Sequence, residues 1–233
     1  MRLAKKTVMM SVVALAVTGG LWAQRPGRGG GMNPFGGVPS FGLQNPTIGS
    51  GSEYQTTTNG KDMDLAIVAL DKEDVAGQTG YWMEMRMTSA DLGGEMVMKT
   101  LVVSSATESG IKRMIMQRPG APPMEMPSMM MNMMQQHQPP PITSKGEGGP
   151  GGTGELVGTE SVTVPAGTFN CQHYRKQDPK GTTYLWISTQ VTPYAMVKMT
   201  SPGATMVLKK VLTNETSHIK GEPQKMQFPG MPQ

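Results

Sequence analysis

The sequence of 233 residues predicts an all-β protein, with one antiparallel sheet curled into a half-barrel or an open barrel. Apolar and polar residues alternate with a period of two through most of residues 53–220, which is the pattern of half-buried strands. Turn residues separate the alternating runs, and Asn59-Gly60 is the strongest hairpin signal among them. Outside one methionine-rich segment, residues 53–220 show no long helical period. Short connections make neighbouring strands antiparallel and predict a meander.

The first part of the chain has the order of a secretory signal. In residues 1–23, basic residues precede the apolar run 8–17, and Ala23 is the residue expected before the cut. The apolar run is shorter than the ~20 residues of a spanning helix, so we expect no stable membrane span after signal removal. The expected location is periplasmic or secreted. Residues 24–52 are rich in Gly and Pro and predict a disordered linker.

Charge and cysteine content exclude several classes of protein. The chain has 21 basic and 17 acidic residues, and 18 basic residues remain without the three of the signal, so the net charge falls from +4 to +1. A nucleic-acid binder would carry a clustered basic surface, which is missing here. A single cysteine, Cys171, excludes an internal disulfide. The chain contains no phosphate loop, serine elbow or motif of paired carboxylates. We therefore expect neither an enzyme nor a cofactor.

The predicted β domain covers residues 53–220 and is interrupted by an insertion at 118–154 that is rich in Met, Pro and Gly. Proline denies a strand its ladder donor, which places this segment outside the sheet. Residues 221–233 predict a disordered tail. The expected strands are 53–59, 62–70, 80–89, 95–104 and 110–117 before the insertion, and 155–164, 168–177, 182–189, 194–200, 204–213 and a short 216–220 after it.

One part of the sequence resembles a known family. The motifs are Val164-Pro165-Ala166-Gly167-Thr168-Phe169, Leu185-Trp186-Ile187-Ser188, Pro193 and Val197-Lys198-Met199. They resemble a pattern in exported bacterial β-proteins related to the periplasmic lipoprotein carriers of the LolA and LppX type. The resemblance covers mainly 155–213 and more loosely 53–117. It implies an antiparallel half-barrel with an apolar concave face, although this chain lacks the long helices that plug the carriers.

Two strands supply the expected ligand-binding residues. Tyr81, Met83 and Met85 share one face of a strand, and Tyr184 and Trp186 share one face of a later strand. Together they predict a non-enzymatic binding protein that holds a lipid, another apolar or amphiphilic ligand, or a segment of an envelope protein partner. Cross-strand packing is the alternative role of the two later aromatic residues.

The methionine cluster of the insertion has two interpretations. In the first, Ser128 caps a short helix that runs to about His137 and covers the open sheet. The lid residues would be Met129, Met130, Met133 and Met134. In the alternative, thioether sulfurs bind Cu(I) in a periplasmic copper-handling protein. The metal ligands would then be Met129, Met131, Met133, Met134 and His137.

Cys171 and His173 lie two residues apart on a predicted strand, so both side chains point to the same face. A thiol beside an imidazole is the starting point of a nucleophile or of half a metal site. The spacing of residues in the sequence does not place a third catalytic or metal-binding side chain beside this pair. The favoured interpretation is therefore a buried cysteine, acting as a small apolar residue, beside a histidine at the rim.

Overall fold

The computed structural model describes residues 46–104, 109–131, 154–179 and 181–225. Before and within the insertion the strands are β1 (Ser50–Thr58), β2 (Lys61–Val75), β3 (Gln78–Ser89), β4 (Gly94–Ser104), β5 (Ser109–Gln117) and β6 (Met124–Glu125). After it come β7 (Glu155–Val164), β8 (Gly167–Asp178), β9 (Gly181–Ile187), β10 (Met196–Ser201), β11 (Ala204–Leu212) and β12 (Gln224–Lys225). A 3₁₀ turn, η1 (Ala90–Leu92), joins β3 to β4. Within these ranges, no helix has the length and apolar character needed to cross a bilayer.

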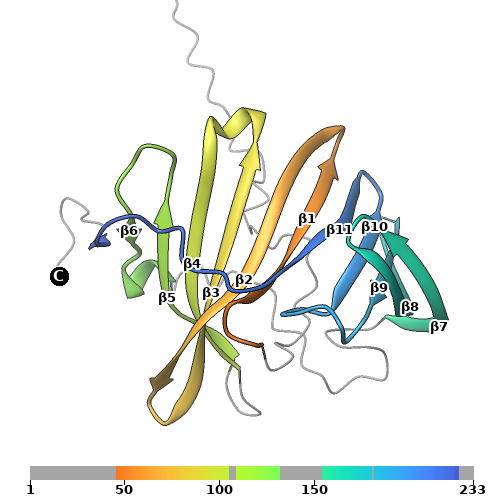
Figure 1. Cartoon of the computed structure of the whole chain (residues 1–233), viewed down its shortest axis with the longest axis horizontal. Coiled ribbons are helices and arrows are strands. Elements are labelled where there is room, and N and C mark those ends of the chain that lie inside the picture. Colours follow the sequence, from red (N-terminus) through yellow and green to blue (C-terminus); the bar gives the residue numbers. More distant parts are fainter. Residues whose placement is uncertain (1–45, 105–108, 132–153, 180, 226–233) are drawn as a thin grey trace, which may run out of the picture. The chain divides into compact units, whose positions relative to one another are not determined.

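The described strands form one sheet in the order β12-β6-β5-β4-β3-β2-β1-β11-β10-β9-β8-β7 (Figure 1). The sheet is not closed into a barrel, and all neighbours are antiparallel except β12 and β6, which are parallel. The predicted fold class is therefore confirmed. The meander is split into two runs, β1 to β6 and β7 to β11, and β1 joins them by pairing with β11. The insertion thus lies between two runs of strands in the sequence, and the first strand of the first run pairs with the last strand of the second run.

Several boundaries differ from the predicted ones. The signal, most of the linker and residues 132–153 lie outside the described residues. β1 begins at Ser50, inside the predicted linker. β2 continues to Val75, because its pairing with β3 shifts by one residue between Ala69 and Asp71 and then goes on to Val75 and Gln78. β12 lies in the predicted tail and pairs with β6.

The register sorts the side chains of β3 to β5 onto two faces. Met85 pairs with Met98, which pairs with Met116, and directly paired residues point to the same side of a sheet. We call this side the methionine face. It carries Met83, Met85, Met87, Met96, Met98, Met114 and Met116. The opposite face of β3 carries Trp82, Glu84 and Arg86.

Residues 213–223, here called the C-terminal strap, run from β11 across the face that carries Glu84 to β12 (Figure 1). The short strand predicted at 216–220 is wrong, because the strap bonds to side chains instead of a strand ladder. The His218 amide donates to Glu84 and the Lys220 amide to Gln117. Ile219 packs on an apolar cluster of Trp82, Leu101 and Ile115.

The loop between β9 and β10 packs on β1. The Tyr54 hydroxyl donates to the Met196 carbonyl at 3.0 Å, and Ser52 Oγ donates to the Thr192 carbonyl. Burial raises the pKa of Tyr54 and raises that of Tyr194, in the same loop, to about 12. These contacts fix the junction between the two runs of strands.

Candidate functional site

The methionine face is an apolar surface built from flexible side chains. Met83, Met85, Met87, Met98 and Met114 are buried, whereas Met96 and Met116 are partly exposed. Tyr81 points to the same side and is partly exposed. Unbranched thioether side chains adapt their shape to what they contact, unlike the β-branched residues that usually fill sheets. The face is therefore one whose side chains can change shape.

The structure does not bring Tyr184 and Trp186 onto the methionine face. Trp186 pairs directly with Lys198 on β10, and from there direct pairs lead through β11, β1 and β2 to Thr88 on β3. Directly paired residues point to the same side of a sheet, so Trp186 lies on the side of Thr88. Thr88 shares that side of β3 with Glu84, opposite the methionines. A ligand that lies on one face of the sheet thus contacts one of the two predicted groups. Their role in ligand binding stays a prediction.

Trp186 already has partners on its own face. The His173 ring stacks on it with centroids 4.5 Å apart, and Lys198 Nζ lies 4.9 Å from the indole centroid. Glu160 Oε1 accepts the indole N–H and lies 3.0 Å from His173 Nδ1. This arrangement is the cross-strand packing considered for Trp186, extended over β7 to β10.

Cys171 lies beside His173 but is buried, and its Sγ lies 3.5 Å from the Phe169 carbonyl oxygen. Burial, with the nearby Glu160 carboxylate, raises the pKa of the thiol. Since the thiolate is the nucleophile, a raised pKa suppresses reactivity. These observations favour a small apolar residue over a nucleophile.

The methionine cluster of the insertion is described only up to Met131. Residues 128–131 are helical, and the predicted continuation to about His137 lies outside the described residues. The amides of Met130 and Met131 donate to the Pro127 carbonyl, so Pro127 occupies the cap position that was predicted for Ser128. Met131 is buried, whereas Met129 and Met130 are exposed. Met133, Met134 and His137 lie outside the described residues, so the lid and the copper site both stay predictions. No three His, Cys, Asp or Glu side chains gather as a metal site among the described residues.

A buried pair of charges holds the strap. Glu84 is 0% and Arg86 6% exposed, and Arg86 Nε donates to Glu84 Oε1 at 2.8 Å. Arg86 also donates to the Glu215 carboxylate and to the Thr216 carbonyl, both at 2.6 Å. Glu84 accepts from Ser217 Oγ and from the His218 amide. Both charges are thereby paired and hydrogen-bonded, as burial requires.

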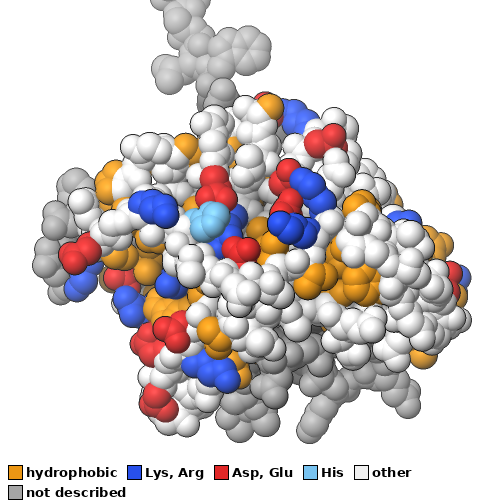
Figure 2. Space-filling model, viewed as in Figure 1, with side chains coloured by type: hydrophobic (Ala, Val, Ile, Leu, Met, Phe, Trp, Pro, Cys, Tyr) orange, Lys and Arg blue, Asp and Glu red, His pale blue; other side chains and the backbone are white. Residues whose placement is uncertain are grey.

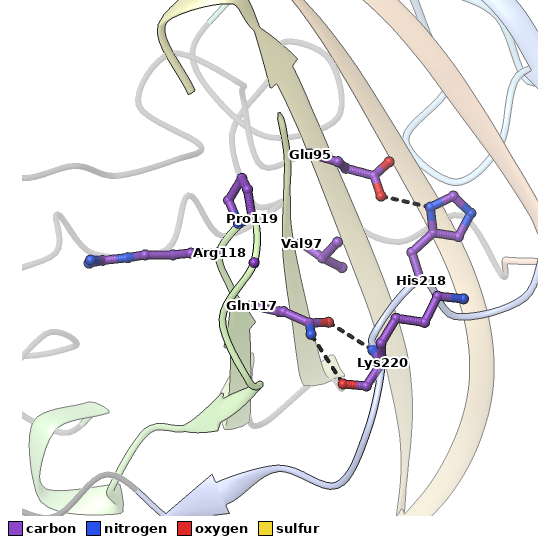
Figure 3. A pocket seen from close by; sticks show the side chains of 8 residues that line it. Glu95, Val97, Gln117, Arg118, Pro119, His218 and Lys220 are labelled. Carbon is purple, nitrogen blue, oxygen red and sulfur yellow. Dashed lines mark hydrogen bonds and ion pairs between the residues drawn. The ribbon is translucent and has the colours of Figure 1, made fainter. Parts of the chain in front are cut away.

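A pocket of about 350 Å³ opens where the strap passes the ends of β4 and β5 (Figure 3). Its lining residues are Glu95, Val97, Gln117, Arg118, Pro119, Gly120, His218 and Lys220. His218 Nδ1 lies 2.9 Å from Glu95 Oε2, which joins the strap to β4. Charged side chains gather on this face of the molecule (Figure 2).

Sequence reasoning missed both the buried pair and the pocket. It named Glu84 and Arg86 only as members of the face opposite the methionines, and this face is covered by a segment about 130 residues further along the chain. The available signal was a pair of opposite charges, Glu84 and Arg86, two residues apart on a strand whose other face carries Met83, Met85 and Met87.

No protein-family model and no curated protein matches the chain. Among solved structures, it is similar to a protein described as exported, with a YmcC-like fold, from Bacteroides fragilis. The identity is 15% over 71% of this chain and 96% of that chain, with a TM-score of 0.33. A protein described as a lipoprotein, from Parabacteroides distasonis, is similar at 12% identity with the same coverage and a TM-score of 0.34. A relation to the lipoprotein carriers is not shown and stays a prediction.

Proposed function

We propose that the protein is an exported, non-enzymatic binding protein that holds an apolar or amphiphilic molecule on the methionine face. The molecule is a lipid or the apolar segment of an envelope protein. The signal-like residues 1–23 support the location outside the cytoplasm.

One observation carries the proposal: seven methionines from three adjacent strands share one face. A core built only for stability favours residues with well-defined rotamers, whereas methionine-rich surfaces suit ligands of varied shape. Most of the face is buried, so a ligand enters only when what covers the face moves aside. Met96 and Met116 are the partly exposed members and would contact it first.

The test is uptake of a dansyl-labelled fatty acid by the delipidated protein, followed by fluorescence. We expect saturable binding, about tenfold weaker in the double variant Met96→Gln/Met116→Gln because two apolar contacts are lost. Leu156→Gln is the matched control, since this exposed side chain lies on β7, at the opposite end of the sheet. No uptake above that of an unrelated globular protein, or equal losses in variant and control, would contradict the proposal.

Copper handling is the alternative. Of its predicted ligands, the structure describes Met129, which is exposed, and Met131, which is buried. A Cu(I) competition titration distinguishes the two functions: the alternative fails when replacing the methionines of 129–134 by leucine leaves Cu(I) affinity unchanged.

A further inference from the structure

Four methionines form one straight row across the neighbouring strands β3 to β6 (Figure 1). Met85 on β3 pairs directly with Met98 on β4, Met98 with Met116 on β5, and Met116 with Met124 on β6. Directly paired residues point to the same side of a sheet, with Cβ atoms about 5 Å apart. The row therefore lies on the methionine face and extends that face to β6.

The exposure of the row increases toward β6. Met85 and Met98 are 2% and 3% exposed, whereas Met116 and Met124 are partly exposed. Met98 and Met124 flank Met116 at one strand spacing, about 4.8 Å, on either side. Because an unbranched thioether side chain has three rotatable bonds, both neighbours can lean toward Met116. Three sulfur atoms can thus meet at a place that a small ion reaches from solvent.

Thioether sulfur is a soft donor without charge. Such donors select Cu(I), whereas Mg²⁺ and Ca²⁺ require oxygen ligands, which the paired methionines do not supply. Packing is the other role of such a row, and leucine would serve it equally well. The two roles therefore differ in one respect that can be measured, which is whether the sulfur atoms are needed.

We propose that Met98, Met116 and Met124 bind one soft monovalent metal ion, of the class of Cu(I) and Ag(I). Met116 is the central ligand, and the other two sulfurs approach the ion from either side. The site is distinct from the copper ligands predicted in the insertion, because none of its residues lies in 129–137. It also goes beyond the proposed function, since an apolar ligand uses only the apolar surface of these side chains.

The experiment titrates Ag(I), which keeps one oxidation state, into the protein labelled with ¹³C at its methionine methyl groups, in a buffer free of chloride. The methyl resonances of Met98, Met116 and Met124 should shift together and saturate at one equivalent of Ag(I). The resonances of the exposed Met129 and Met130 should stay in place at that ratio.

Leucine variants test whether sulfur is required. Met116→Leu and Met124→Leu should each weaken Ag(I) binding about 100-fold or more, since losing a direct ligand costs at least as much as losing an outer-shell partner. Both changes conserve apolar volume, so uptake of the dansyl-labelled fatty acid should not change. Met63→Leu is the matched control, because Met63 is partly exposed on the same side of the sheet, on β2, outside the row.

The two readouts keep the metal site and the proposed function apart. Lost Ag(I) binding in both row variants, with Met63→Leu like the wild type, supports the metal site whether or not the fatty acid binds. The metal site is overturned when Ag(I) shifts no methionine, shifts Met129 and Met130 instead of the row, or binds the row variants as tightly as the wild type. A change of about tenfold in Ag(I) affinity between pH 5 and 8 would also overturn it, because histidine and cysteine ligands exchange protons and thioethers do not.

Discussion

Replacing Arg86 by methionine tests whether a buried charge pair fastens the strap to the sheet. Methionine keeps the apolar stem of the side chain and removes the guanidinium group, with its bonds to Glu84, Glu215 and the Thr216 carbonyl. Removing one partner of a buried pair costs about 3–5 kcal/mol. Glu84 keeps two donors, Ser217 Oγ and the His218 amide, so we expect a loss near 3 kcal/mol.

The assay is urea unfolding, with hydrogen exchange of the His218 amide as a local probe. Arg86→Met should lower the free energy of unfolding and speed exchange of that amide. Lys61→Met is the control, because Lys61 and Asp91 form an ion pair with side chains 77% and 68% exposed, and its loss should leave the unfolding midpoint unchanged. A loss below about 1 kcal/mol in Arg86→Met would refute the assigned role of the pair.

Three further predictions concern other parts of the fold. Gly94→Ala should cost about 1–3 kcal/mol in urea unfolding, because its φ is +153° and the new Cβ would meet Pro119, whereas Gly158→Ala, with open space around its Cβ, should be neutral. A thiol reagent at neutral pH should label Cys171 slowly in the folded protein and fast in urea, and rapid labelling of the folded state would disprove its burial. Burial raises the pKa of Tyr194 from 10.0 to about 12 in the folded state. Between pH 10 and 12 the unfolded chain loses this proton while the folded state keeps it, so the free energy of unfolding should fall as the pH rises over that range. Tyr194→Phe should weaken that fall in alkaline unfolding curves, and an unchanged fall would contradict the raised pKa.

Local patterns predicted the strands well, because alternation and turn residues act over a few positions. The hairpin at Pro165-Ala166-Gly167 and the shared face of Met83 and Met85 both follow from such patterns and are present. The order of the two runs was not predictable in the same way, since β1 and β11 are about 150 residues apart in the chain.

The candidate site, too, was predictable within single strands but not between strands that are distant in the sequence. Which residues share a face of one strand follows from a period of two, but which strands share a face depends on a register carried across the sheet. Trp186 and Met85 were grouped from separate strands, and that register places them on opposite sides. The strap was missed because Glu84 and Arg86 bind it through side chains, which leave no periodic pattern.

The most direct test of the proposed binding function is NMR of the protein labelled at its methionine methyl groups with ¹³C, during titration with oleate. The account predicts that the resonances of Met83, Met85, Met98 and Met114 move together and saturate. Met206 lies on the same side of the sheet but on β11, which β1 and β2 separate from β3, so its resonance should move less than those four. Oleate that shifts only the exposed Met129 and Met130, or no methionine at all, would contradict a ligand on the methionine face.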